Sequence, residues 1–297
     1  MTWALQEAQL RDARLRLITA YGIPLLGYTT MAVAYQEAFN TIREIASNTV
    51  RDARAKVLDQ GVEVSGATVE GDAAGALIKA SEAAGLLVVG SRGLGGFAGR
   101  ILGSVSSALP GHAQCAVVVI PSAEAKGKQT NRERGTSLAF SGVVAGIDGS
   151  DYAAAAALTA AEYAQRRGLG LTVIWSRPPV PSYIPWRLAD AEMNELQAYV
   201  ENEAEWLKGH FPDLDITARF YDRLPVETLA DATATADLVV LGNRGHGGFA
   251  GLMMGSTSQS VVHHLRGPVM IVPTDKKAPD PRLENRTSSM PTLADHR

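Results

Sequence analysis

The sequence predicts an α/β protein with two tandem, doubly wound parallel-sheet domains, the first of which lacks its N-terminal strand. Two observations carry this prediction. Apolar, β-branched runs alternate with amphipathic segments along the chain, which is typical of parallel sheets covered by helices on both faces. The chain also repeats itself at an offset of 152 residues. The repeated segments are Gly90-Ser-Arg-Gly93 with Gly103-Ser104, and Gly242-Asn-Arg-Gly245 with Gly255-Ser256.

The composition fits two globular domains and excludes several classes of protein. The 297 residues are enough for two domains that each bury a core. A net charge of −3 leaves no basic footprint for nucleic acid. The single cysteine, Cys115, excludes an internal disulfide framework and is interpreted as a small buried side chain. No apolar run reaches about 18 residues and no signal peptide is recognised, so we expect a cytoplasmic protein that does not enter a membrane.

The first domain is predicted to span residues 1–123. Its expected helices cover residues 2–13, Met31–Leu58, Asp72–Ala84 with Asp72 as the cap, and a segment from Ser104 that Pro110-Gly111 should stop. Its expected strands are Leu15–Tyr21, Val62–Val69, Leu86–Val89 and Ala116–Ile120. A charged linker over residues 124–139 follows.

The second domain is predicted to span residues 140–274. Its expected strands are Gly142–Ile147, Leu169–Trp175, Leu214–Tyr221, Asp237–Leu241 and Val269–Pro273. Its expected helices are Ala153–Arg167, Leu188–Lys208, Val226–Thr235 and Thr257–Leu265. Residues 177–185 form a proline-rich connector, and residues 275–297 are predicted to be a disordered tail.

Each glycine-rich loop leaves a buried strand and leads to a helix N-terminus. Glycine permits close approach of the backbone, and the first N–H groups of a helix have no partner within it, so this arrangement suits an anion such as phosphate. In the second half the candidate residues are Gly242, Gly245, Gly255, Ser256 and Thr257. The corresponding residues of the first half are Gly90, Gly93, Gly103, Ser104 and Val105.

Asp148 follows the first strand of the second half. Its carboxylate could accept hydrogen bonds from a ribose hydroxyl or a base amino group, or it could simply cap the next helix. Ligands of doubly wound sheets bind at the carboxyl ends of the strands, so we expect Asp148 to lie beside the Gly242 loop. Together the two features predict a nucleotide site.

These residues resemble the universal stress protein family, over residues 1–123 and 140–274 and in its tandem, actinobacterial form. The resemblance is carried by Val144-Ala-Gly-Ile-Asp148-Gly-Ser150 and by Gly242-x2-Gly245-x9-Gly255-Ser256. It implies a Rossmann-like fold and ATP as the ligand. Asp148 would lie near adenine or ribose, and Gly242, Gly245, Gly255, Ser256 and Thr257 around the ribose and phosphates. It also implies a last strand that pairs domains or subunits.

The first half departs from the family pattern because it has no counterpart of residues 142–150. The repeat offset places the partner of Asp148 before Met1. We expect either that the protein starts upstream or that its first domain is degenerate. The first loop could still hold phosphates, but the second half is expected to be the stronger site.

The sequence favours a nucleotide-dependent regulatory protein of the stress response over an enzyme. No acidic residue lies between Gly242 and Leu265, and no catalytic or metal-binding residue is assigned. A slow ATPase remains an alternative, with Mg²⁺ held mainly by phosphate oxygens. So does a nucleotide-free scaffold that acts through dimerisation. We expect Val117–Ile120 and Val269–Val272 to join the two domains, and homodimers to be a further form of assembly.

Overall fold

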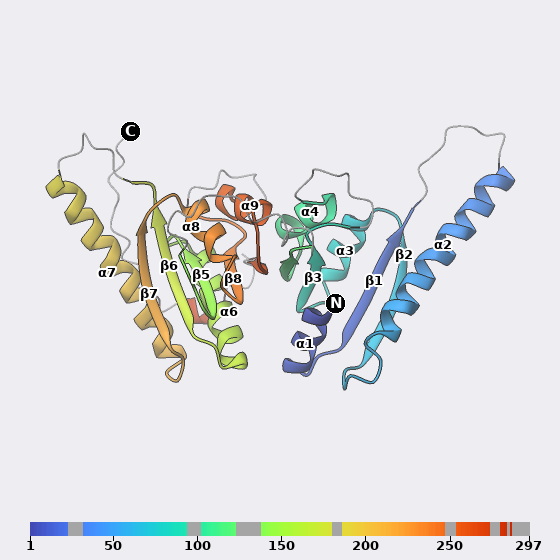
Figure 1. Cartoon of the computed structure of the whole chain (residues 1–297), viewed down its shortest axis with the longest axis horizontal. Helices are drawn as coiled ribbons and strands as arrows, with labels where there is room; N and C mark the ends of the chain where they lie inside the picture. Colours follow the sequence, from blue (N-terminus) through green and yellow to red (C-terminus); the bar gives the residue numbers. More distant parts are fainter. Residues whose placement is uncertain are drawn as a thin grey trace. The chain divides into compact units, whose positions relative to one another are not determined.

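A computed structural model describes residues 1–22, 32–93, 102–122, 138–179, 186–246, 254–273, 280–283 and 286, and Figure 1 labels its elements along the chain. The chain forms two compact units, Met1–Ala83 and Ala84–Arg297. Most of the predicted linker, 124–139, and of the proline-rich connector, 177–185, lies outside the described residues. Among the described residues, none of the helices combines the length and the apolar character needed to cross a membrane.

The first unit contains α1 (Thr2–Leu10), β1 (Leu15–Tyr21), α2 (Ala32–Ala55), β2 (Val64–Glu70) and α3 (Ala73–Ser81). Strands β1 and β2 pair in parallel from end to end. Helix α2 packs on both strands. Asp72 caps α3 as predicted, because its carboxylate accepts a hydrogen bond from the backbone N–H of Gly75 at 2.7 Å.

The second unit is built on one sheet, whose described strands run in the order β3-β4-β9-β8-β5-β6-β7. Its elements are β3 (Leu86–Gly90), α4 (Ser104–His112), β4 (Ala116–Ile120), β5 (Val143–Ile147), α6 (Asp151–Arg167), β6 (Leu171–Arg177), α7 (Trp186–His210), β7 (Ile216–Asp222), α8 (Pro225–Ala232), β8 (Leu238–Gly242), α9 (Ser256–His263), β9 (Val269–Val272) and the 3₁₀ turn η1 (Pro281–Leu283). Neighbouring strands are parallel except at β4 and β9.

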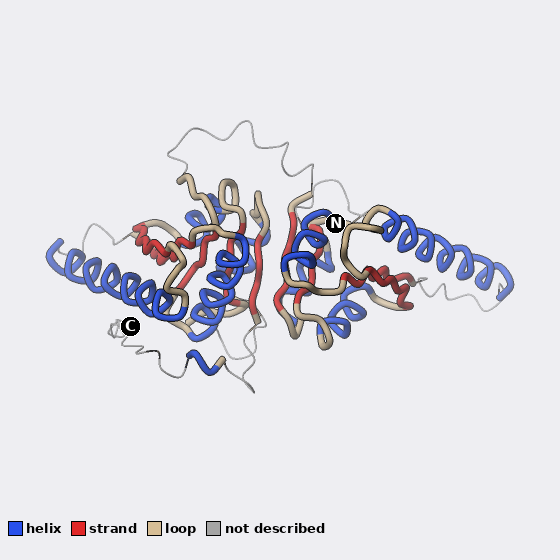
Figure 2. The backbone as a smooth tube through the Cα atoms, turned by 90° about the horizontal axis from the view of Figure 1, so that it is seen from below, coloured by secondary structure: helices blue, strands red, loops and turns tan. Residues whose placement is uncertain are grey.

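Helices cover both faces of this sheet, as the predicted doubly wound architecture requires (Figure 2). On one face, Trp175 of β6 packs edge-on against Tyr199 of α7, with ring centroids 5.2 Å apart. Ile174 precedes Trp175 and is paired with Gly146 of β5, which lies against Leu229 of α8. Successive side chains of a strand point to opposite faces. Helices α7 and α8 therefore cover opposite faces.

The two repeats meet in the antiparallel pair of β4 and β9, which are the strands predicted from the sequence to join the domains. Val117, Val118 and Val119 lie opposite Ile271, Met270 and Val269, and all six side chains are buried. Strand β4 lies between β3 and β9, and β9 between β4 and β8. Neither strand therefore has a free edge for a second copy of the chain, and a homodimer stays a prediction that needs another surface.

The described part of the first repeat has no counterpart of β5, in agreement with the predicted loss of a strand. Strand β5 pairs with β6 on one side and with β8 on the other. The repeat makes β1 the counterpart of β6 and β3 the counterpart of β8, yet β1 and β3 belong to different sheets. The compact units divide between these two sheets, at Ala83–Ala84. The predicted domain boundaries, 1–123 and 140–274, thus follow the sequence repeats and differ from the compact units.

Helix α4 extends further than the sequence predicts. Pro110-Gly111 was expected to stop it, but the helix continues to His112, so this prediction is wrong. Pro110 has no N–H to donate to the carbonyl of Ser106, which normally destabilises a helix. Leu109 and Pro110 are both buried, and we attribute the continuation to the packing of these two side chains.

Part of the predicted disordered tail, 275–297, has defined structure. The structure describes residues 280–283 and 286 of this segment. Residues Pro281–Leu283 form η1, and the side chain of Arg286 is only 3% exposed. The proline and charge content of this segment indicates disorder. Composition cannot predict that one arginine of the segment is buried by residues that lie far away in the sequence.

Cys115 is expected to react slowly with thiol reagents in the native protein. Its side chain is buried, and this burial raises the pKa of the thiol, so less of the reactive thiolate is present at neutral pH. Colorimetric thiol labelling at pH 8 should be at least about tenfold slower in the native than in the denatured protein. Because the chain has a single cysteine, the labelling rate of the denatured protein is the control for the same thiol in the native protein. Equal rates would contradict this expectation.

Candidate nucleotide site

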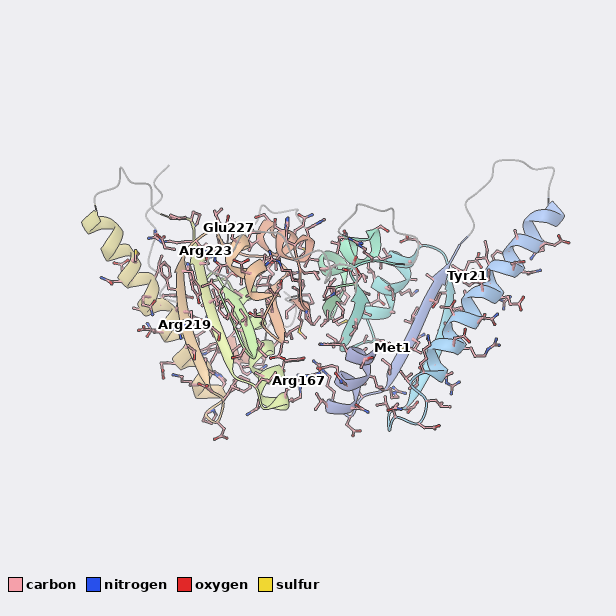
Figure 3. All side chains as sticks on the ribbon, viewed as in Figure 1. Met1, Tyr21, Arg167, Arg219, Arg223 and Glu227 are labelled. Carbon is pink, nitrogen blue, oxygen red and sulfur yellow. The ribbon has the colours of Figure 1, made fainter. Side chains whose placement is uncertain are left out.

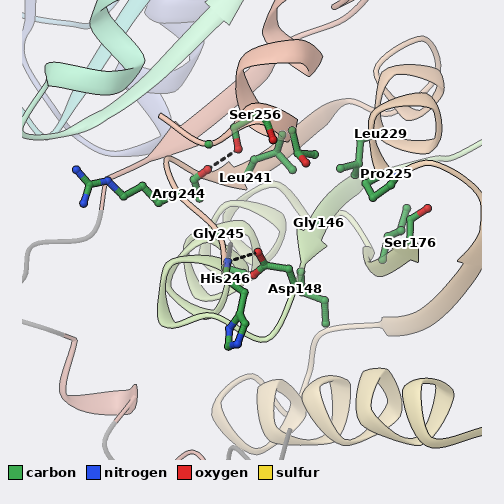
Figure 4. A pocket seen from close by; sticks show the side chains of 17 residues that line it. Gly146, Asp148, Ser176, Pro225, Leu229, Leu241, Arg244, Gly245, His246 and Ser256 are labelled. Carbon is green, nitrogen blue, oxygen red and sulfur yellow. Dashed lines mark hydrogen bonds between the residues drawn. The ribbon is translucent and has the colours of Figure 1, made fainter. Parts of the chain in front are cut away.

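A cavity of about 390 Å³ opens at the carboxyl ends of β5, β6 and β8 (Figure 4). In a doubly wound sheet this is the switch point, because β6 and β7 follow β5 on one side and the chain then crosses to β8 on the other side. The N-termini of α8 and α9 complete the walls. All six residues predicted for the second half line the cavity: Asp148, Gly242, Gly245, Gly255, Ser256 and Thr257.

Asp148 connects the two loops that form the cavity. Its Oδ1 accepts hydrogen bonds from the backbone N–H of Ser150 at 3.1 Å and from the Ser150 hydroxyl at 2.6 Å. Its Oδ2 accepts one from the backbone N–H of His246 at 2.8 Å. The N-cap of α6 is Ser150, whose Oγ accepts from the N–H of Ala153 at 3.2 Å. The alternative interpretation of Asp148 as the helix cap is therefore wrong.

Two glycines allow this close approach of backbone and carboxylate. A Cβ on Gly245 would collide with Oδ2 of Asp148, so a side chain at this position would displace the carboxylate from His246. A Cβ on Gly242 would lie 2.8 Å from the carbonyl oxygen of Tyr152 and 3.0 Å from that of Arg244. These glycines are required by the space around them rather than by a left-handed backbone.

The N-terminus of α9 is available to an anion. Its N-cap is Gly255, which makes no side-chain capping bond, and its first turn contains no acidic residue. Helix α6, by contrast, is capped by Ser150 and begins with Asp151. The free N–H groups and the helix dipole both favour negative charge at α9. The hydroxyl of Ser258 donates to the carbonyl of Gly242 at 2.7 Å and so fixes α9 to the loop.

The opposite wall is apolar, and the sequence analysis did not identify it. It is lined by Ile147, Ala153, Ile174, Pro225, Leu229 and Leu241. Ser176 also lines the cavity, and its hydroxyl donates to the carbonyl of Arg223 at 2.7 Å. Arg223 pairs with Asp231 at 3.1 Å and with Glu227 at 3.9 Å, which fixes the start of α8 (Figure 3). The sequence did contain a signal for this wall: Ile174 and Ser176 lie near the carboxyl end of β6, the strand that pairs with β5.

The polar groups that line the described part of the cavity include few that could act as a base or hold a metal ion. Among the described lining residues, Asp148 is the single carboxylate, and it already accepts three hydrogen bonds. In the described part of the chain, no group of three or more His, Cys, Asp or Glu side chains could hold a metal ion. Arg244 extends away from Asp148 (Figure 4). The site thus offers a carboxylate, an apolar wall and a free helix N-terminus.

The residues predicted for the first half are placed elsewhere. Gly90 ends β3, Gly93 follows it, Gly103 is the N-cap of α4, and Ser104 and Val105 begin that helix. None of the five lines the cavity described above. The two loops share one closing bond: the N–H of Gly103 donates to the carbonyl of Ser91, and the N–H of Gly255 to the carbonyl of Asn243, both at 2.8 Å. Nucleotide binding by the first half stays a prediction.

Comparison with known proteins agrees with the repeat. The model of the Universal stress protein family matches residues 1–121 and 140–273. The chain is 30% identical over 306 residues to Universal stress protein Rv1996 of Mycobacterium tuberculosis, covering 93% of this chain and 92% of that protein. It is 31% identical over 279 residues to Universal stress protein Rv2623 of the same species, covering 91% and 90%. The crystal structure of a universal stress protein from Archaeoglobus fulgidus DSM 4304 has a similar fold, with a TM-score of 0.59 at 19% identity and coverage of 93% and 91%.

Proposed function

This chain belongs to the universal stress protein family, and from that premise we propose that its second repeat binds ATP and acts as a nucleotide-dependent regulator in the stress response. The apolar wall receives the adenine ring. Asp148 accepts hydrogen bonds from the ribose hydroxyls or the adenine amino group. The triphosphate lies at the N-terminus of α9, against the backbone of Gly242, Gly245 and Gly255.

One observation carries this proposal: Asp148 and the glycine loop are in direct contact although 98 residues separate Asp148 from His246 in the sequence. A carboxylate for the nucleoside and an uncapped helix for the phosphates therefore open into one cavity. Its volume of about 390 Å³ lies within the range of small-molecule sites. The apolar surface suits the base, the carboxylate acceptor suits the ribose hydroxyls, and the anion site suits the phosphates.

Binding is favoured over hydrolysis by the same residues. A catalyst would need a base or a metal-binding carboxylate next to the phosphates. Among the described lining residues, the single carboxylate is Asp148, which is held by Ser150 and His246. In the described part of the chain no group of His, Cys, Asp and Glu side chains fits a magnesium site, so any Mg²⁺ that accompanies ATP would be held through phosphate oxygens and water.

Calorimetric titration with ATP tests the proposal. We expect about one ATP per chain, since among the described residues it is the second repeat that brings a carboxylate and a glycine loop into one cavity. Chromatography of the recovered nucleotide should return unchanged ATP after incubation. Two bound ATP molecules would mean that the first repeat completes a site of its own, and steady formation of ADP would favour the slow ATPase. The absence of heat at millimolar ATP would reject nucleotide binding and leave the scaffold.

A further inference from the structure

A single arginine of the C-terminal segment is buried against α7, within the second unit. The side chain of Arg286 is 3% exposed. Its Nε donates to both carboxylate oxygens of Glu203, at 2.9 and 3.1 Å, and one terminal nitrogen donates to the hydroxyl oxygen of Tyr199 at 2.7 Å. Both partners lie on α7. The guanidinium is therefore held in one orientation, with donors left for other acceptors.

The remaining donors of Arg286 reach the loop that carries Asp148. The nitrogen that binds Tyr199 also donates to the carbonyl of Gly149 at 3.3 Å, and the other terminal nitrogen lies 3.4 Å from Oδ1 of Asp151. Gly149 directly follows Asp148, and its backbone is left-handed, with φ of +84°. These contacts are long, but their donor is fixed by shorter bonds on α7. Arg286 thus holds the loop from the side of α7 and does not line the cavity.

The buried carboxylate of Glu203 strongly favours the observed position of Arg286. Its side chain is 5% exposed, and a buried carboxylate is strongly unfavourable without a paired cation. In the described part of the chain, Arg286 is its ion-pair partner. Tyr199, with a pKa raised first by burial and then by the charge of Glu203, stays neutral and accepts the bond from Arg286. The ring of Tyr199 packs on Trp175 of β6, so the anchor extends into the core.

A second arginine fixes the same segment at a different place. Arg282 pairs with Glu162 of α6 at 2.8 Å and with Asp280 at 2.6 Å. Among the described residues, these two partners lie outside the loop after β5, and the side chain of Arg282 is 35% exposed. The segment is thus fastened to α6 by Arg282 and to α7 by Arg286. Arg282 provides a matched control for Arg286, because it is also a tail arginine in ion pairs.

We propose that Arg286 is a positioning residue for the nucleotide site: it fastens the loop of residues 148–151 to α7 and so prepares Asp148 for the ligand. The C-terminal segment thereby becomes part of the binding apparatus without touching the nucleotide. This inference rests on the proposed function for its effect on ATP, and on geometry alone for its effect on the loop. A loop held before binding loses less conformational freedom when the ligand arrives.

The test compares Arg286→Ala with Arg282→Ala by two measurements. Hydrogen–deuterium exchange of the nucleotide-free protein reports on the loop itself. Residues 149–153 should exchange at least about tenfold faster in Arg286→Ala, and at the normal rate in Arg282→Ala. Calorimetry should show ATP affinity about tenfold weaker in Arg286→Ala. Both measurements are made well below the unfolding temperature, so that a loss of global stability does not mimic the effect.

Two further variants separate positioning from simple stabilisation. Arg286→Lys keeps a cation for Glu203 but cannot reach Glu203 and Gly149 together, so it should recover the thermal midpoint without recovering ATP affinity. If Arg286→Ala does not fold because Glu203 is left unpaired, Arg286→Ala with Glu203→Gln removes that charge and receives the same measurements. Normal loop exchange together with normal ATP affinity would overturn the inference. If the native protein binds no ATP, the proposed function fails, while the exchange measurement still decides the role of Arg286.

Discussion

Replacement of Asp148 by alanine is expected to weaken ATP binding about 100-fold. Two contributions of the carboxylate would be lost together. In the proposed function it offers charged acceptors to the nucleoside, and in the structure its Oδ2 accepts a hydrogen bond from the backbone N–H of His246 at 2.8 Å. Without the carboxylate, His246 loses its hydrogen bond to the residue that follows β5. Part of the binding free energy of ATP is then needed to order the loop, so the affinity falls. Calorimetric titration measures the loss directly.

Asp213→Ala is the matched control for this variant. It removes the same charge, and Asp213 is an exposed residue between α7 and β7 that does not line the cavity. We therefore expect ATP affinity within about threefold of the native value. Asp148→Asn should fall between the two, because an amide can replace one acceptor oxygen but not both. Native affinity in Asp148→Ala would contradict the assignment of this residue to the nucleotide.

Replacement of Gly242 by alanine is expected to lower the stability of the protein by about 2–3 kcal/mol. The new Cβ would lie 2.8 and 2.9 Å from the carbonyl oxygen and carbon of Tyr152, at the start of α6. These are backbone atoms between a buried strand and a helix, so neither side can move without disturbing the core. Differential scanning calorimetry should show the thermal midpoint reduced by roughly 5–10 °C.

The repeat supplies the control for this second variant. Gly90 is the counterpart of Gly242, but among the described residues the nearest atoms to a Cβ there would be the carbonyl oxygen of Arg92 at 3.2 Å and its backbone nitrogen at 4.0 Å. Gly90→Ala is therefore expected to cost less than about 1 kcal/mol. A similar loss in both variants would show that the effect comes from the glycine in the strand and not from its contact with α6. The comparison uses one chemical change at two positions that the sequence makes equivalent.

Local sequence patterns determined much of the fold. The predicted bounds of β1 and β4 agree with the structure. Strand β4 is a run of β-branched side chains that ends before Pro121, and β1 is a short, mostly apolar run. The glycine loop before α9 and the cap of α3 were also recognisable, since each depends on a few adjacent residues. The duplication and the missing first strand could be read from spacing alone. For the site, the repeat and the Asp148 segment indicated the residues that later proved to line the cavity.

Only the tertiary structure decided how these segments meet. The contact of Asp148 with His246, the apolar wall from β6 and α8, and the burial of Arg286 each join residues far apart in the chain. The same holds for the antiparallel pairing of β4 with β9 and for the division at Ala83–Ala84. Sequence periodicity reports which face of an element is apolar, but not which partner covers it. That choice depends on the packing of the whole chain, and in this protein it also decides which carboxylate contacts the glycine loop after β8.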